Sequence, residues 1–216
     1  MEKIVFVDGF AIRNSLDVDF TALHRHSTNI GSYSPKFYIP EGEVWIDQIL
    51  KDEADFLMAV DAFIDPAAKG LSYEELRDEA RIKFRTEGDM PEHVVRSEER
   101  EGITVRYIDG KIVRNYLDPE FVMGGHDLVY DYIPDGEIWI DAKVDPVEAL
   151  FVLCHEIVER DHMKKGKSYE VAHEHGSVVE REMRRKVGEA HYPGDDEYTW
   201  FADSNETIIK EHYAKE

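Results

Sequence analysis

The sequence predicts an α+β fold of two tandem, similar lobes, each made of short strands followed by a helical hairpin. The first observation is an internal repeat, in which residues 2–20 (EKIVFVDGFAIRNSLDVDF) match residues 103–121 (ITVRYIDGKIVRNYLDPEF) without a gap. The second is that residues 38–47 (YIPEGEVWID) return as residues 132–141 (YIPDGEIWID). Such a repeat indicates duplicated structural units, which allows the lobes to meet through like surfaces about a pseudo-twofold axis.

We divide the chain into an N-terminal lobe (1–88), a linker (89–101), a C-terminal lobe (102–190) and a C-terminal extension (191–216). The linker assignment rests on the charged sequence TEGDMPEHVVRSEERE at 86–101, which Gly and Pro interrupt. The extension has no counterpart in the first copy. We expect it to pack on the C-terminal lobe through Tyr198, Trp200 and Phe201.

In the first lobe, residues 1–9 predict a strand that ends at Asp-Gly. Residues 38–47 predict two short strands around a Glu-Gly turn. Residues 52–64 predict a helix that Pro66 stops. Ser72 and Glu75 have the spacing of a capping box, so a second helix should begin there and run to about residue 85.

The composition excludes several classes of function. The net charge of −21 disfavours binding to nucleic acid or anionic membranes, because phosphate contacts need Lys and Arg. A basic protein partner remains compatible with it. No apolar run has the length of a signal peptide or a transmembrane helix. The single cysteine, Cys154, lies in an apolar run and fits a reducing compartment. We therefore expect a cytoplasmic protein, in the host cytoplasm if it is viral.

The most informative segment is 145–185, which predicts two helices joined by a tight turn. Asp145 suits the N-cap and Pro146 the first helical position. The apolar run ALFVLC at 149–154 indicates a buried helix. His155, Glu156 and Glu159 follow it directly. Because residues four apart share a helix face, His155 and Glu159 should point the same way.

The second helix should return along the first and bring His173 opposite that face. Ala172 and Gly176 are small residues four apart, which allows close helix approach. We predict a metal site with His155, Glu159 and His173 as ligands and Glu156 as the catalytic base. Zinc suits two imidazoles and one carboxylate, although Fe, Mn or Ni are alternatives. A purely structural polar network is the other interpretation. His126 is a further candidate ligand or substrate contact.

This segment resembles known patterns in two ways. H-E-x-x-E is similar to the zincin motif H-E-x-x-H, with a carboxylate in place of the second histidine. H-E-x-x-E-R-x-x-M, followed by S-Y-x-x-A-H and by Glu180, resembles a group of uncharacterised phage and prophage proteins, over about residues 124–180. The resemblance implies a metallohydrolase of viral or mobile-element origin.

The first hairpin lacks this set of residues. A gapless alignment places Asp61 and Asp65 at the positions of His155 and Glu159, and an earlier gap would place Ala59 and Phe63 there instead. The S-Y motif places Arg77 at the position of His173. We hypothesise that Arg77 forms salt bridges with both aspartates, which would replace the metal in a degenerate copy of the site.

The sequence therefore favours a metal-dependent, peptidase-like hydrolase that acts on a peptide or protein. The alternative from the charge is an acidic, non-catalytic phage-type binding protein, either an inhibitor or a DNA mimic. A virion or assembly component is a third interpretation. The sequence leaves open the substrate, the metal, the oligomeric state and the roles of His126 and Glu180.

Overall fold

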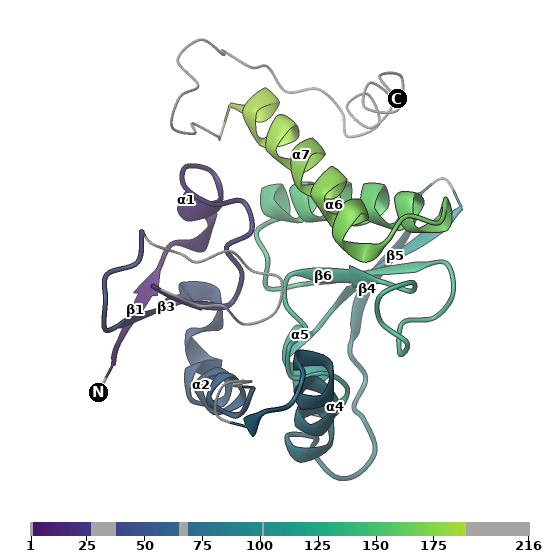
Figure 1. The fold of residues 1–216 in the computed structure, drawn as a ribbon. Coiled ribbons are helices and arrows are strands. Elements are labelled where there is room, and N and C mark those ends of the chain that lie inside the picture. Colours follow the sequence, from purple (N-terminus) through teal and green to yellow (C-terminus); the bar gives the residue numbers. More distant parts are fainter. Residues whose placement is uncertain (1, 27–37, 65–68, 101, 189–216) are drawn as a thin grey trace.

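The computed structural model describes residues 2–26, 38–64, 69–100 and 102–188, and it confirms the α+β class. Within these residues there are two small sheets, six α-helices and one 3-10 helix. Of the two long C-terminal helices, the first covers one face of the four-stranded sheet and the second packs on the first (Figure 1). None of the described helices is long and apolar enough to cross a membrane.

The two sheets have the same connectivity. In the first, β1 (Lys3–Val7) leads through helix α1 (Gly9–Arg13) to β2 (Leu23–Arg25) and β3 (Glu43–Asp47). In the second, β5 (Ile103–Ile108), helix α5 (Gly110–Tyr116), β6 (Gly124–His126) and β7 (Glu137–Asp141) follow in the same order. In both, the first and last strands pair in parallel and the short middle strand pairs antiparallel to the last. The sequence repeat therefore corresponds to a repeated topology.

The linker predicted at 89–101 contains a strand. Residues Val94–Arg100 form β4, which pairs antiparallel with β5 at the edge of the second sheet. The segment VVRSEER was mistaken for a linker because most of its side chains face solvent, which an edge strand tolerates. The second sheet thus has the order β4-β5-β7-β6, whereas the first has β1-β3-β2.

The prediction of two short strands in residues 38–47 was also wrong, and the matching residues 132–141 show the same structure. Each forms a turn and then one strand, with the Glu43 amide donating to the Pro40 carbonyl at 3.1 Å and the Glu137 amide donating to that of Pro134 at 3.0 Å. Gly42 and Gly136 have φ angles of 79° and 82°, which L side chains rarely adopt. The Glu-Gly and Asp-Gly pairs therefore end turns that lead into β3 and β7, and they do not close hairpins.

Each lobe continues into two helices. In the first, the 3-10 helix η1 (Gln48–Glu53) leads into α2 (Ala54–Phe63), and α4 (Tyr73–Lys83) begins at the predicted capping box of Ser72. In the second, α6 (Pro146–Lys164) has the predicted N-cap, Asp145, whose side chain accepts from the Val147 amide. Helix α7 (Tyr169–Val187) then packs along α6 (Figure 1). The predicted C-terminal extension, with Tyr198, Trp200 and Phe201, lies outside the described residues.

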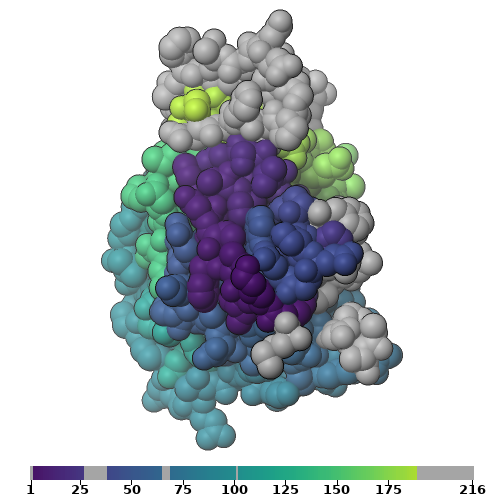
Figure 2. Space-filling model, turned by 90° about the vertical axis from the view of Figure 1, so that its left-hand side faces the viewer, coloured from purple at the N-terminus to yellow at the C-terminus, as the bar shows by residue number. Residues whose placement is uncertain are grey.

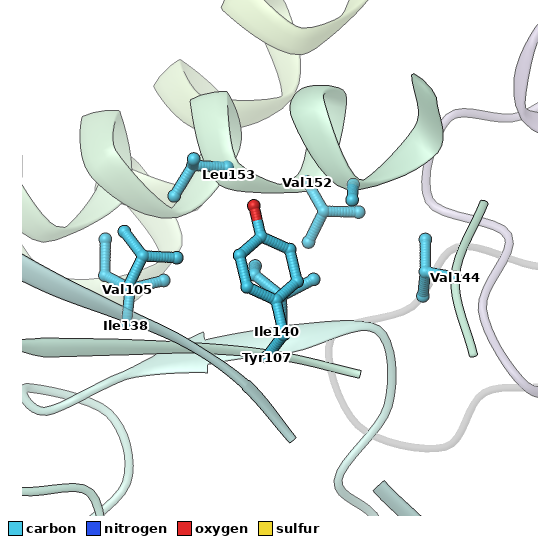
Figure 3. Close-up of a cluster of buried hydrophobic side chains, with 8 residues drawn as sticks. Val105, Tyr107, Ile138, Ile140, Val144, Val152 and Leu153 are labelled. Carbon is cyan, nitrogen blue, oxygen red and sulfur yellow. The ribbon is translucent and has the colours of Figure 1, made fainter. Parts of the chain in front are cut away.

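The core of the second lobe fixes helix α6 on the sheet. Val152 and Leu153 from α6 lie over Val105, Ile138 and Ile140 from the strands (Figure 3). On its other side α6 packs against α7 through a separate buried cluster of Phe151, Cys154, Val158, Val179 and Met183. Because α6 is buried on both sides, the polar residues it carries next to Cys154 are held in a rigid frame.

Two buried arginines join the lobes in a reciprocal way. Arg13 of the first lobe bonds to Glu148 of the second at 2.5 Å, and Arg114 of the second bonds to Glu53 of the first at 2.8 and 2.9 Å. Each arginine also bonds the aspartate that ends its own lobe's strand, Asp47 or Asp141. Figure 2 shows the contact from outside, where atoms of the N-terminal segment (purple) border those of the C-terminal helices (green). Equivalent residues of the two lobes therefore contact each other reciprocally, as they would if a pseudo-twofold axis related the lobes.

Candidate metal site between the two lobes

The structure brings His155, Glu159 and His173 together on the α6–α7 hairpin. His155 and Glu159 lie one turn apart on α6 and are buried, whereas the His173 side chain is 32% exposed. Close approach of the helices depends on Gly176, because a Cβ there would lie 3.0 Å from the His155 ring. The small residue predicted to allow helix contact therefore makes room for a candidate ligand.

Three ligand atoms of these residues form a small triangle. His155 Nε2 lies 3.0 Å from His173 Nδ1 and 3.3 Å from Glu159 Oε2, and His173 Nδ1 lies 2.9 Å from the same carboxylate oxygen. Each of the three atoms can bind a metal ion. Two imidazoles and a carboxylate on one triangle leave further coordination positions open, which is the arrangement of catalytic zinc sites.

A carboxylate fixes the orientation of His155. Its Nδ1 lies 3.0 Å from Glu180 Oε2, and Arg184 in turn holds the other Glu180 oxygen at 2.6 and 3.0 Å. If Nδ1 donates to Glu180, a neutral His155 presents the lone pair of Nε2 to the triangle. Metal-binding histidines usually have such a carboxylate on their second nitrogen. Glu180, whose role the sequence left open, therefore positions His155.

His126 orients Glu159 and is not itself a good ligand. The Leu128 amide donates to His126 Nδ1 at 3.1 Å, so Nε2 must carry the proton of the neutral ring. That proton is donated to Glu159 Oε1 at 3.0 Å. The arrangement leaves Glu159 Oε2 to face the two other histidines. His126, Glu156 and Glu159 also lie close enough to hold an ion, but His126 has no lone pair to offer in this tautomer.

The cluster is arranged to hold positive charge. Burial alone would raise the pKa of Glu159, but hydrogen bonds from His126, His155 and His173 lower it far below its usual range. Burial alone would lower the pKa of His155, yet Glu159 and Glu180 raise it well above its usual range. Without a metal, a proton on His155 therefore balances the carboxylates. A divalent ion can replace that proton, because metal binding and protonation compete for the same nitrogen.

Glu156 differs from the other acids of the cluster. It is partly exposed, and among the described residues no hydrogen bond or ion pair holds its carboxylate. Burial, followed by the negative charge of Glu159, raises the pKa of Glu156 to about 7. It lines a cavity of about 100 Å³ together with His155, Glu159 and His173. A carboxylate with this pKa beside a candidate metal is suited to exchange protons with a bound molecule.

The first lobe contributes Asp19, which the sequence analysis missed. Asp19 Oδ1 accepts from the Ser177 hydroxyl at 3.1 Å and lies 3.9 Å from His173 Nε2. Both candidate histidine ligands thus have a carboxylate near the nitrogen that faces away from the triangle. The available signal was the repeat itself, because Asp19 corresponds to Glu120 and acidic residues close both copies of LDxxF.

The register predicted for the first hairpin is wrong by one residue. Glu53 and Glu148 have equivalent arginine partners, so residue 53 corresponds to 148 and not to 147. The equivalents of His155 and Glu159 are then Val60 and Ile64, which are buried and apolar. They are neither Asp61 and Asp65 nor Ala59 and Phe63. The error arises because the connection from strand to helix is one residue longer in the second lobe.

The hypothesis of an Arg77–Asp61 salt bridge is also wrong. Arg77 bonds Asp118 of the second lobe at 3.0 Å and lies 3.6 Å from Glu120, whereas Asp61 pairs with Arg25. Asp65 lies outside the described residues. Arg77 joins the lobes, because the position equivalent to His173 faces the other lobe in each copy.

Comparisons of the chain with known protein families, with curated proteins and with solved structures find no match.

Proposed function

We propose that the protein is a metal-dependent hydrolase whose site lies on the α6–α7 hairpin. The observation that carries the proposal is the triangle of His155 Nε2, His173 Nδ1 and Glu159 Oε2, with edges of 2.9–3.3 Å. The carboxylates Glu180 and Asp19 near the outer nitrogens support it, because a polar network without metal needs no such convergence of lone pairs. Zinc is the ion that this donor set favours.

The ion would be held by His155, Glu159 and His173. When bound, a zinc ion polarises a water molecule and lowers its pKa toward about 7. The chain's own contribution is Glu156, which lines the same cavity as the three candidate ligands. It can accept a proton from the attacking water and then deliver it to the leaving amine. This division of roles is that of a peptidase, so a peptide or protein is the proposed substrate.

The decisive experiment combines metal analysis with one conservative substitution. Purified protein, reconstituted with zinc, should contain close to one equivalent, and Glu156→Gln should retain it. Cleavage of a mixed peptide library, followed by mass spectrometry, should fall by about 10²–10⁴-fold in Glu156→Gln. The matched control is Asp161→Asn, because Asp161 lies on the same helix, pairs with Lys165 at the surface and lines none of the cavities.

Two results would contradict the proposal. One is the absence of tightly bound zinc, iron, manganese or nickel after reconstitution. The other is library cleavage that is the same in Glu156→Gln and in the unsubstituted protein, which would make the site structural. Either result would favour the second candidate, an acidic binding protein that docks on a basic partner, which the net charge of −21 supports.

A further inference from the structure

A second and larger cavity adjoins the candidate metal site. It has a volume of about 400 Å³ and lies between the lobes. The two cavities share five lining residues, Thr21, Val122, Val129, Tyr130 and Tyr169. The Tyr169 ring also stacks on the candidate ligand His173, with centroids 5.5 Å apart. A molecule at the metal site can therefore extend into the larger cavity past Tyr169.

The larger cavity is the first lobe's version of the candidate site. Strand pairing places Leu23 and His24 at the positions of Gly124 and Gly125, and helix register places Val60 and Ile64 at those of His155 and Glu159. All four first-lobe residues line the larger cavity, and all four counterparts line the smaller one. In the first copy, apolar residues of the cavity wall, Val60 and Ile64, thus take the positions of the candidate ligands of α6.

The walls of the larger cavity are mostly apolar, and their charged groups are paired. Ten apolar side chains contribute from both lobes: Ala22, Leu23, Leu57, Val60, Ile64, Pro119, Val122, Leu128, Val129 and Met163. Asp61 is paired with Arg25. Arg77 is paired with Asp118 and faces Glu120. Burial raises the pKa of Glu120, whose carboxyl accepts from the Tyr73 hydroxyl at 2.9 Å. The charged side chains that line the cavity therefore already have partners of opposite charge.

We propose that this cavity binds a large aliphatic or aromatic side chain of the peptide substrate, next to the bond that is hydrolysed. The inference deepens the proposed function and rests on it for the word substrate. The volume of the larger cavity lies within the range of about 300–1,000 Å³ that is usual for small-molecule sites. Burial of such a side chain contributes about 1.5–3 kcal/mol, which corresponds to roughly 10–100-fold in affinity.

The test uses binding to metal-free protein, so it does not depend on catalysis. The probes are N-acetyl-phenylalanine amide, N-acetyl-leucine amide and the glycine, lysine and glutamate amides, titrated by NMR. The phenylalanine and leucine amides should bind roughly 10-fold or more tightly than the other three. Their shift changes should centre on residues that line the larger cavity only, such as Leu57 and Tyr73.

Two exposed apolar residues give a matched pair of variants. Leu128 lines the larger cavity and is 42% exposed, so Leu128→Asp should fold and should weaken phenylalanine amide binding at least about fivefold. Val95, on β4, is 65% exposed and outside the cavity, so Val95→Asp should leave binding unchanged.

Equal binding of all five amides, or unchanged binding in Leu128→Asp, would overturn the pocket. These outcomes are separate from the failure of the proposed function, which shows as missing metal or as library cleavage insensitive to Glu156→Gln. If the protein cleaves peptides, the preferred residue beside the cut should be large and apolar, and Leu128→Asp should weaken that preference. Cleavage with a preference for charged residues at every position near the cut would also overturn the pocket.

Discussion

The two helical hairpins can be compared position by position, because Glu53 and Glu148 fix their register. The second hairpin has His155 and Glu159 where the first has Val60 and Ile64. The position of His173 is taken by Arg77. Both hairpins keep an acid at the remaining position, Asp61 in the first and Glu156 in the second. The strand residue that faces this acid's helix is Arg25 in the first lobe and His126 in the second.

The same strand-and-hairpin topology therefore balances its buried acids with different cations in the two lobes. The first lobe supplies arginines, which stay charged at all ordinary pH values: Arg25 pairs with Asp61 of the same lobe, and Arg77 pairs with Asp118 of the second lobe. In the second lobe, Glu159 is balanced by three histidines. A histidine can release its proton and present a lone pair, which an arginine cannot do. Of the two arrangements, only the second therefore offers nitrogen lone pairs of the kind that a metal ion needs.

The largest expected difference between the two hairpins concerns metal binding. His155→Ala removes one of the three candidate ligands and one partner of Glu180, so on the proposed function tight zinc binding should disappear. Val60→Ala changes the equivalent position of the first lobe and should leave zinc stoichiometry unchanged. Zinc is measured by elemental analysis after gel filtration, with circular dichroism to show that both variants fold. Equal zinc content in the two variants would show that the hairpins do not differ in this way.

A second contrast concerns the buried glutamates that join the lobes. Glu148 accepts from two buried arginines, Arg13 and Arg184, whereas Glu53 accepts from Arg114 and from Lys143, whose side chain is 31% exposed. Removal of one partner of a buried ion pair costs about 3–5 kcal/mol. Glu148→Ala should therefore lower the free energy of unfolding by about this amount, and Glu53→Ala should cost less, because water can solvate Lys143. Urea denaturation measures both, and an equal or reversed order would contradict this account.

The sequence was sufficient for the parts of the molecule that local rules govern. The repeat predicted two copies of one topology, and the spacing of His155 and Glu159 predicted one helix face. It was insufficient where packing decides. Strand β4 was missed because charged residues at a sheet edge resemble a linker. The register of the first hairpin was missed because one residue differs in the connection between strand and helix.

The contribution of Asp19 could not be predicted, because it depends on how the lobes meet. Its distance in sequence from Ser177 is 158 residues. Nothing local to either segment indicates the contact. The role of His126 likewise depends on a tautomer, which the Leu128 amide fixes. Residue types can be read from a sequence, but the nitrogen that carries a proton follows from the folded backbone.

The third contrast tests the lobe contact at the site. Asp19→Asn removes the negative charge near His173 Nε2, and Glu120→Gln makes the equivalent change near Arg77. Loss of such a partner typically weakens metal binding by about 10–100-fold. We expect the lower end of this range, about 10-fold, for Asp19→Asn, because the 3.9 Å separation exceeds hydrogen-bond length. Competition with a zinc chelator measures the affinity. Glu120→Gln should leave it unchanged, and an equal effect of both substitutions would indicate a general loosening of the interface.

The smallest expected effect comes from the partly exposed ion pairs beside the buried ones. Asp52 of the first lobe bonds Lys143 at 2.8 Å and Lys111 at 3.3 Å. The bond from Lys143 outweighs burial and lowers the pKa of Asp52 from 3.8 to about 2. Because the folded-state pKa lies below the ordinary value, the stabilisation is complete above about pH 4 and is lost as the pH falls toward 2.

Asp52→Asn should therefore lower the free energy of unfolding at pH 7 by less than about 1 kcal/mol, because the side chain is 57% exposed and solvent screens the pair. The difference between Asp52→Asn and the unsubstituted protein should shrink as the pH falls from 4 to 2. Asp55→Asn, at an exposed acid three residues further on in the adjoining helix α2, is the matched control. Urea denaturation at pH 7, 4 and 3 supplies the measurement. If the difference in the free energy of unfolding grew toward low pH, the predicted pH dependence would be wrong, and Asp52 would not contribute to the ion pairs that hold the lobes together.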